Sequence, residues 1–99
     1  MKLKETIYEI LIGESLQELH QNGIAMQIEN LFEKNSECDK LYEAVYEANR
    51  TVCAKLGVEE SKEIETILWN LDKIQRIIAM KMYDYGCQIA KNEENTKDI

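Results

Sequence analysis

Residues 60–91 read ESKEIETILWNLDKIQRIIAMKMYDYGCQIAK, with apolar side chains at gaps of mostly three and four. Such gaps follow one face of an α-helix. The whole chain of 99 residues contains no proline, the residue that most often interrupts helices. The stretch therefore predicts one long helix over residues 60–91. Its expected core stripe consists of Ile64, Ile67, Leu68, Leu71, Ile74, Ile78, Met82, Tyr85 and Ile89.

The pattern of residues 37–56 predicts a second helix before this one. Asn35 and Ser36 precede it as capping residues, and acidic side chains follow in its first turn, where the helix dipole favours them. Gly57 stands where a helix commonly ends in a left-handed residue. Only a short connection, 58–61, separates the two helices, which indicates an antiparallel hairpin.

The N-terminal third of the chain has less regular signals. Apolar side chains in residues 2–12 favour a short helix, and Ser15 to Glu18 has the spacing of a capping box. Gly23 is a candidate helix end. A helical stripe is expected to continue through Ile24, Ile28, Leu31 and Phe32 to about Lys34. The pattern leaves open whether residues 2–34 form one kinked helix or several pieces.

These segments predict an all-α fold: an antiparallel helical hairpin with N-terminal helical segments packed across it, as a small helix bundle. The length fits a single domain. We expect this domain to span residues 1–91 and to be followed by a flexible polar tail, residues 92–99.

The charge balance excludes several classes of function. With 12 basic and 19 acidic side chains and a net charge of -7, the chain lacks the clustered cations that direct nucleic-acid binding needs. No apolar run approaches the roughly 20 residues of a membrane span. Glu5 and Tyr8 interrupt the N-terminal region where a signal peptide would be apolar. We therefore expect a cytoplasmic protein with no membrane partner.

The cysteines and the single histidine do not form a recognisable metal or catalytic motif. Cys38, Cys53 and Cys87 are an odd number without a CxxC pair, so we expect reduced, buried thiols rather than disulfides or a zinc site. His20 has no partner acid indicated by spacing. It is expected to be a surface or half-buried imidazole rather than a catalytic base.

One acidic cluster matches a metal motif in spacing only. Glu59, Glu60 and Glu63 have the EExxE arrangement of helical nucleotide pyrophosphohydrolases, but the second acidic motif of those enzymes is absent here. Acidic residues at a helix start are the simpler interpretation. The sequence thus predicts a protein that is not an enzyme and holds no cofactor or metal.

The long helix is apolar on a second face as well. At 100° per residue, Trp69, Met80, Tyr83 and Cys87 fall nearly opposite the expected core stripe. A helix apolar on two sides is covered on both by its own chain or meets a partner. The cover is therefore the N-terminal segments, a second copy in a homo-oligomer such as a dimer, or both together. The predicted interface residues are Trp69, Lys73, Arg76, Met80 and Tyr83, because aromatic, Met and Arg side chains dominate contact energies.

Two short stretches carry a resemblance to a known family. Residues 7–14, IYEILIGE, and residues 82–90, MYDYGCQIA, resemble an uncharacterised family of small helical proteins from prophages and conjugative elements of Gram-positive bacteria. The chain departs from that family's pattern in lacking a proline after Gly13. The resemblance implies a bacterial or mobile-element setting and no particular activity.

These observations predict a non-enzymatic protein-interaction or accessory module that self-associates and contacts a further protein partner. The alternative is an acidic inhibitor of a nucleic-acid enzyme, of the kind that phages use against host defence, which presents negative charge in place of phosphates. That alternative needs a concentrated acidic face, whereas the acidic residues here are spread along the chain.

Overall fold

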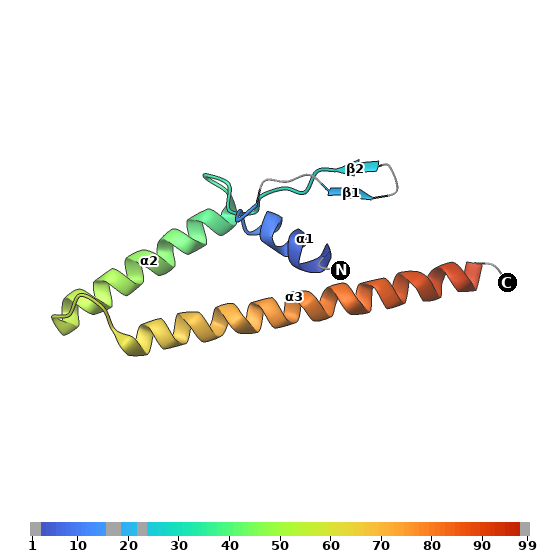
Figure 1. Cartoon of the computed structure of the whole chain (residues 1–99). Helices are drawn as coiled ribbons and strands as arrows, with labels where there is room; N and C mark the ends of the chain where they lie inside the picture. The colour runs from blue at the N-terminus through green and yellow to red at the C-terminus, as the bar shows by residue number, and fades with distance from the viewer. Residues whose placement is uncertain (1–2, 16–18, 22–23, 98–99) are drawn as a thin grey trace.

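The computed structural model describes residues 3–15, 19–21 and 24–97. Their all-α class is as predicted, with one small addition, a hairpin of two three-residue strands (Figure 1). In chain order the elements are α1 (Leu3–Leu11), β1 (Leu19–Gln21), β2 (Ile24–Met26), α2 (Glu37–Leu56) and α3 (Lys62–Lys97).

The helices form an open V rather than a closed bundle. α2 and α3 diverge from their short connection, and α1 lies between the arms and packs on α3 (Figure 1). The radius of gyration is 18.5 Å, whereas a compact domain of 100 residues has about 13 Å. The extents of 65 × 23 × 23 Å confirm the elongated shape. A single copy therefore leaves most of both long helices uncovered.

The bounds of α2 agree with the sequence prediction because both of its ends are determined locally. The Ser36 hydroxyl accepts from the Asp39 amide at 3.1 Å, and the Asp39 carboxylate accepts from the Asn35 amide at 3.0 Å. This reciprocal pairing satisfies donors at the start of the helix. At the other end Gly57 takes a left-handed conformation with φ 72°, and its amide donates to the last turn.

α3 begins at Lys62 behind Ser61, whose hydroxyl accepts from the Ile64 amide at 3.3 Å. It continues for 36 residues to Lys97, six residues past the predicted end at Lys91. The reason is that residues 92–97, NEENTK, contain neither proline nor glycine, so nothing in them stops a helix already propagating. Residues 98 and 99 lie outside the described part of the chain.

The predicted helical stripe from Ile24 to Lys34 is wrong. Residues Ile24–Met26 form β2 and pair antiparallel with β1, His20 standing opposite Ala25, and no helix occurs between the described residues 27 and 36. Pairing with β1 occupies backbone groups of Ile24–Met26 that a helix starting there would need for its own hydrogen bonds. The capping-box residues 16–18 and the predicted cap Gly23 lie outside the described residues.

The segment after the hairpin is tied back to α1. The Leu31 amide donates to the Leu11 carbonyl at 2.7 Å. Gly13, with φ 84°, lies against Asn30, and a Cβ added there would come within 2.7 Å of the Asn30 amide oxygen. That oxygen accepts from the Phe32 amide at 2.9 Å. Gly13 thus allows the chain to pass close to the end of α1.

Little apolar surface is buried within one copy. Across residues 3–15 and 27–94, where side chains are described, the buried apolar residues are Tyr8, Ile10 and Cys53. All three cysteines are free thiols as expected, but the expectation that they are buried holds only for Cys53. Cys38 is half-buried. Cys87 is exposed. It lies almost a full helical turn beyond Asp84, which is the α3 residue nearest the C-terminus with a described hydrogen bond to α1.

Candidate interaction surface

α1 is fixed on the middle of α3 by Tyr8. The side chain is buried, with 7% of its surface exposed. Its hydroxyl accepts from the Gln75 side-chain amide at 3.0 Å. The Arg76 guanidinium stands over its ring at 5.1 Å, a cation–π geometry. One aromatic side chain therefore joins two successive residues of α3.

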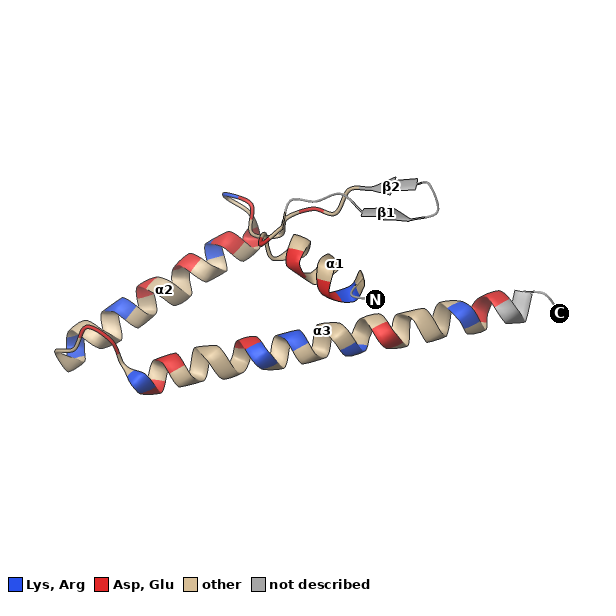
Figure 2. Cartoon of the chain, in the orientation of Figure 1, with Lys and Arg blue, Asp and Glu red and all other residues tan. Residues whose placement is uncertain are grey.

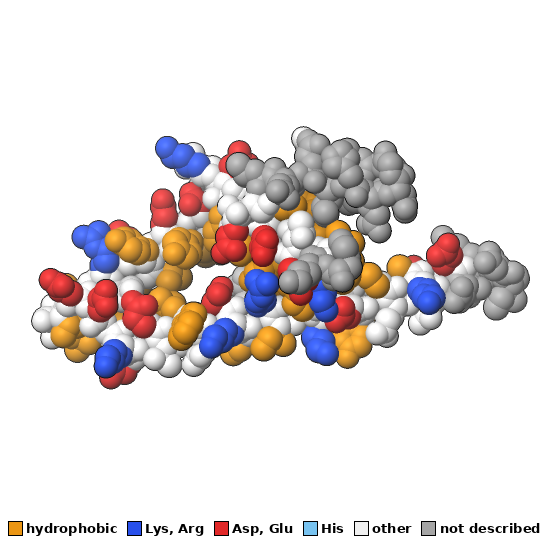
Figure 3. All heavy atoms as spheres, in the orientation of Figure 1, with side chains coloured by type: hydrophobic (Ala, Val, Ile, Leu, Met, Phe, Trp, Pro, Cys, Tyr) orange, Lys and Arg blue, Asp and Glu red, His pale blue; other side chains and the backbone are white. Residues whose placement is uncertain are grey.

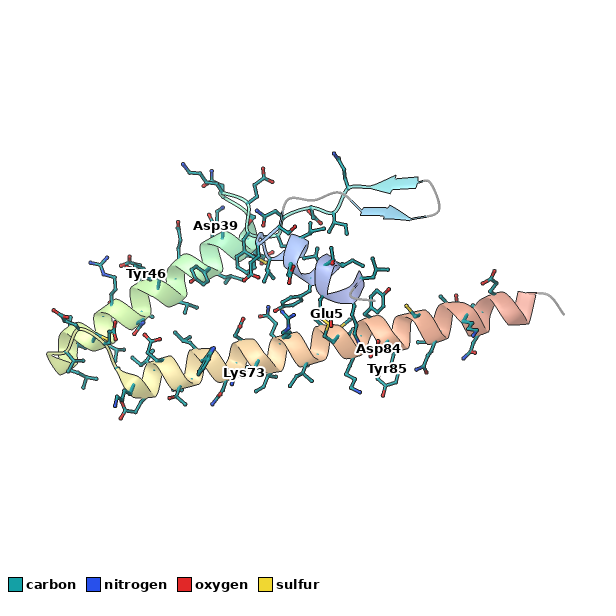
Figure 4. The ribbon with its side chains drawn as sticks, in the orientation of Figure 1. Glu5, Asp39, Tyr46, Lys73, Asp84 and Tyr85 are labelled. Atoms are coloured by element: carbon teal, nitrogen blue, oxygen red, sulfur yellow. The ribbon has the colours of Figure 1, made fainter. Side chains whose placement is uncertain are left out.

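A second attachment lies one turn of α1 earlier. The Lys4 ammonium donates to both carboxylate oxygens of Asp84 at 3.1 Å, and both side chains are partly shielded from water. Between the two attachments Glu5 points from α1 toward α3 (Figure 4). One of its carboxylate oxygens is buried without a hydrogen-bond partner among the described residues. A shallow hollow at this contact is lined by Lys4, Arg76, Ile77, Met80, Lys81 and Asp84.

Four of the five predicted interface residues lie in two different environments. Trp69 is 67% exposed, and the Lys73 ammonium lies over its ring at 4.3 Å. Both come before the α1 contact along α3, and Lys73 lies nearer the α2–α3 connection than that contact does (Figure 4). Arg76 contacts Tyr8 of α1, and Met80 lines the hollow beside it. α1 thus covers part of the second apolar face, and a role for the five in an interface between copies stays a prediction.

Tyr83, the fifth of these residues, is half-buried. Its partial burial raises the pKa of the phenol, and the Cys87 thiol one turn further along raises that pKa again. The phenol is therefore neutral near pH 7 and contributes a neutral hydrogen-bonding group rather than a charge.

The expected core stripe of α3 faces solvent. We define the α3 stripe by the seven apolar residues that are exposed along it, between 51% and 69% each: Ile67, Leu71, Ile74, Ile78, Met82, Tyr85 and Ile89. Of the remaining two predicted stripe residues, Ile64 and Leu68 are half-buried near the turn. The structure thus covers part of the second face and leaves the first face open. The sequence does not indicate this choice, because Tyr8 and Gln75 are 67 residues apart.

α2 also exposes its apolar face. Its uncovered large residues include Leu41, Val45, Val52 and Leu56. On the face of the molecule seen in Figure 3, apolar side chains recur along both arms of the V, with charged side chains between them. Large apolar side chains exposed along two long helices favour contact with another apolar surface.

The charged side chains are intermixed rather than gathered. Lys and Arg alternate with Asp and Glu along both α2 and α3 (Figure 2). Among residues 3–15, 19–21 and 24–97, no three His, Cys, Asp or Glu side chains lie where they could hold a metal ion together. Within the same residues, the helices are too polar or too short for a membrane crossing.

Comparison with family models, with curated proteins and with solved structures finds no match for this chain.

Proposed function

We propose that the protein is a non-enzymatic helical interaction module that acts as a self-associated unit, with a dimer as its smallest form. The observation that carries the proposal is the α3 stripe. Its seven large apolar side chains are all more than half exposed, although their spacing is that of a core-facing helix surface.

The total surface supports the same proposal. The chain exposes 8675 Å², whereas a compact monomer of 11.6 kDa exposes about 5,800 Å². The excess is about 2,900 Å² per chain. Obligate homodimers bury about 2,000–5,000 Å² in total over both copies. One chain therefore carries enough uncovered surface for an interface of that class.

Mass in solution tests this proposal. Light scattering coupled to size exclusion is expected to give at least twice the chain mass of 11.6 kDa at micromolar concentration. A chain that stays monomeric and still unfolds cooperatively would contradict the proposal, because the apolar stripes would then be stable in water without a partner.

The resemblance to prophage and conjugative-element proteins adds a setting to this proposal. A helical module of such an element would join its own copies to a further protein partner. The genes that adjoin this one test the setting, since phage or conjugation genes support it and an unrelated metabolic operon argues against it.

The acidic-inhibitor alternative is not favoured. A mimic of nucleic acid presents many acidic groups on one face, whereas basic side chains here alternate with acidic ones along both long helices (Figure 2). Lys73 and Arg76 are further occupied with aromatic rings.

A further inference from the structure

We infer that two copies pair through antiparallel α3 helices, with the two-fold axis at Ile78. This inference rests on the proposed function, and it names the surface and the orientation of the contact. The partner is a second copy of this chain, and each copy contributes the α3 stripe.

The stripe is long and straight enough for such a contact. From Ile67 to Ile89 it spans 22 residues, which corresponds to about 33 Å of helix. Its residues repeat every 11 positions, as in Ile67, Ile78 and Ile89. An 11-residue repeat has 3.67 residues per turn, close to the 3.6 of a relaxed helix, so the stripe stays on one side with only slight supercoiling.

The spacing of the stripe is symmetric about its centre. The gaps between successive stripe residues are 4, 3, 4, 4, 3 and 4, which read the same in both directions. A two-fold interface uses the same patch on both copies. With the axis at Ile78, Ile67 stands level with Ile89 of the second copy, Leu71 with its Tyr85, and Ile74 with its Met82. Every stripe residue then faces an apolar one. A parallel pair does not require this symmetry.

The arrangement of the other helices also favours the antiparallel orientation. α2 diverges from the N-terminal end of α3 and α1 lies along its middle, while the C-terminal end extends beyond every other described element (Figure 1). Tyr85 directly follows Asp84, which Lys4 of α1 contacts, and Tyr85 and Ile89 are 58% and 57% exposed. Antiparallel pairing places each extension along the N-terminal part of the other copy's stripe, where Ile67 and Leu71 are 57% and 56% exposed. A parallel pair would leave both extensions together at one end, covered only by each other.

Cysteine pairing distinguishes the orientations. The background is Cys87→Ser, which removes an exposed thiol. Three proteins are made in it, each with one cysteine substitution: Ile67→Cys, Ile78→Cys or Ile89→Cys. Each is treated with a short bis-maleimide, and the linked peptides are identified by mass spectrometry. We expect Ile78→Cys to link to itself and the two end variants to give no link alone. Refolded together, Ile67→Cys and Ile89→Cys are expected to link to each other. Ile77→Cys, next to the stripe but outside it, is the unlinked control.

The other outcomes separate this inference from the proposed function. A dimer in which Ile67→Cys links to itself overturns the antiparallel orientation and leaves self-association standing. A dimer with no link at any stripe position overturns the stripe as the contact surface. A monomeric mass for the unsubstituted chain overturns both.

A second pair of variants gives a readout that needs no cross-linking. Ile77 and Ile78 are neighbours of identical type, 62% and 54% exposed. Ile78→Glu is expected to raise the dimer dissociation constant at least 100-fold by placing two carboxylates at the axis, whereas Ile77→Glu is expected to change it less than threefold. Circular dichroism at protein concentrations above both dissociation constants is the check that the two variants still fold. Equal effects of the two substitutions would overturn the inference.

Discussion

Tyr8 is the single side chain on which the position of α1 most depends. It combines burial, a hydrogen bond from Gln75 and the Arg76 guanidinium over its ring. The Lys4 to Asp84 pair adds to this contact, but partly exposed ion pairs contribute little stability. The buried aromatic ring is therefore the main attachment between α1 and α3.

Tyr8→Ala is expected to lower the free energy of unfolding by about 3 kcal/mol, since it removes a buried ring and leaves a cavity. Tyr46→Ala is the matched control, because Tyr46 is 57% exposed and its loss should cost less than about 1 kcal/mol. Urea denaturation followed by circular dichroism measures both. A Tyr8→Ala effect as small as that of the control would mean that α1 is not held in this way.

For single helices and strands, the bounds that could be predicted are those set by residues close in sequence. The bounds of α2 follow from Ser36 at one end and Gly57 at the other, and both were recognisable because capping depends on residues within one turn. The end of α3 was not recognisable, since no residue near Lys91 stops the helix. The pairing of β1 with β2 was missed although Asn22 and Gly23, a pair typical of two-residue hairpin turns, separate the two strands in the sequence, because Gly23 was interpreted as a helix end.

Gly57→Ala is expected to destabilise the protein by about 1 kcal/mol, because an alanine side chain is strained at φ 72°. No atom lies within 4 Å of the added Cβ, so backbone conformation alone accounts for the loss. Gly57→Asn is the control, since asparagine tolerates the left-handed region and should cost less. Thermal unfolding of the three proteins measures the order, and an alanine variant as stable as wild type would contradict it.

At the scale of the whole molecule, stability and association are expected to be one property. The buried apolar residues within the described part of one copy are few, and many large apolar residues of both long helices are exposed. If the second copy buries them, folding and dimerisation are coupled and stability depends on protein concentration.

A tenfold dilution is therefore expected to lower the Tm by about 3–5 °C. A tenfold change in concentration corresponds to about 1.4 kcal/mol of stability, and each kcal/mol shifts the Tm of a protein the size of this dimer by about 2–4 °C. Ile78→Glu, whose dimer is expected to be weaker, should unfold at a lower Tm than the wild type at both concentrations. Differential scanning fluorimetry or circular dichroism at 2 and 20 µM gives the comparison, and a wild-type Tm independent of concentration would contradict the coupling.

Two long helices joined by a tight connection could be predicted from the amino-acid sequence, because helix periodicity and caps depend on residues a few positions apart. The sequence also showed that α3 is apolar on two faces. Only the tertiary structure decided which face α1 covers, since the contacts of Lys4 with Asp84 and of Tyr8 with Gln75 join residues 80 and 67 positions apart. The divergence of α2 and α3, which leaves the α3 stripe exposed, is likewise visible only in the fold. No local sequence pattern indicates how two helices of one chain lie relative to each other.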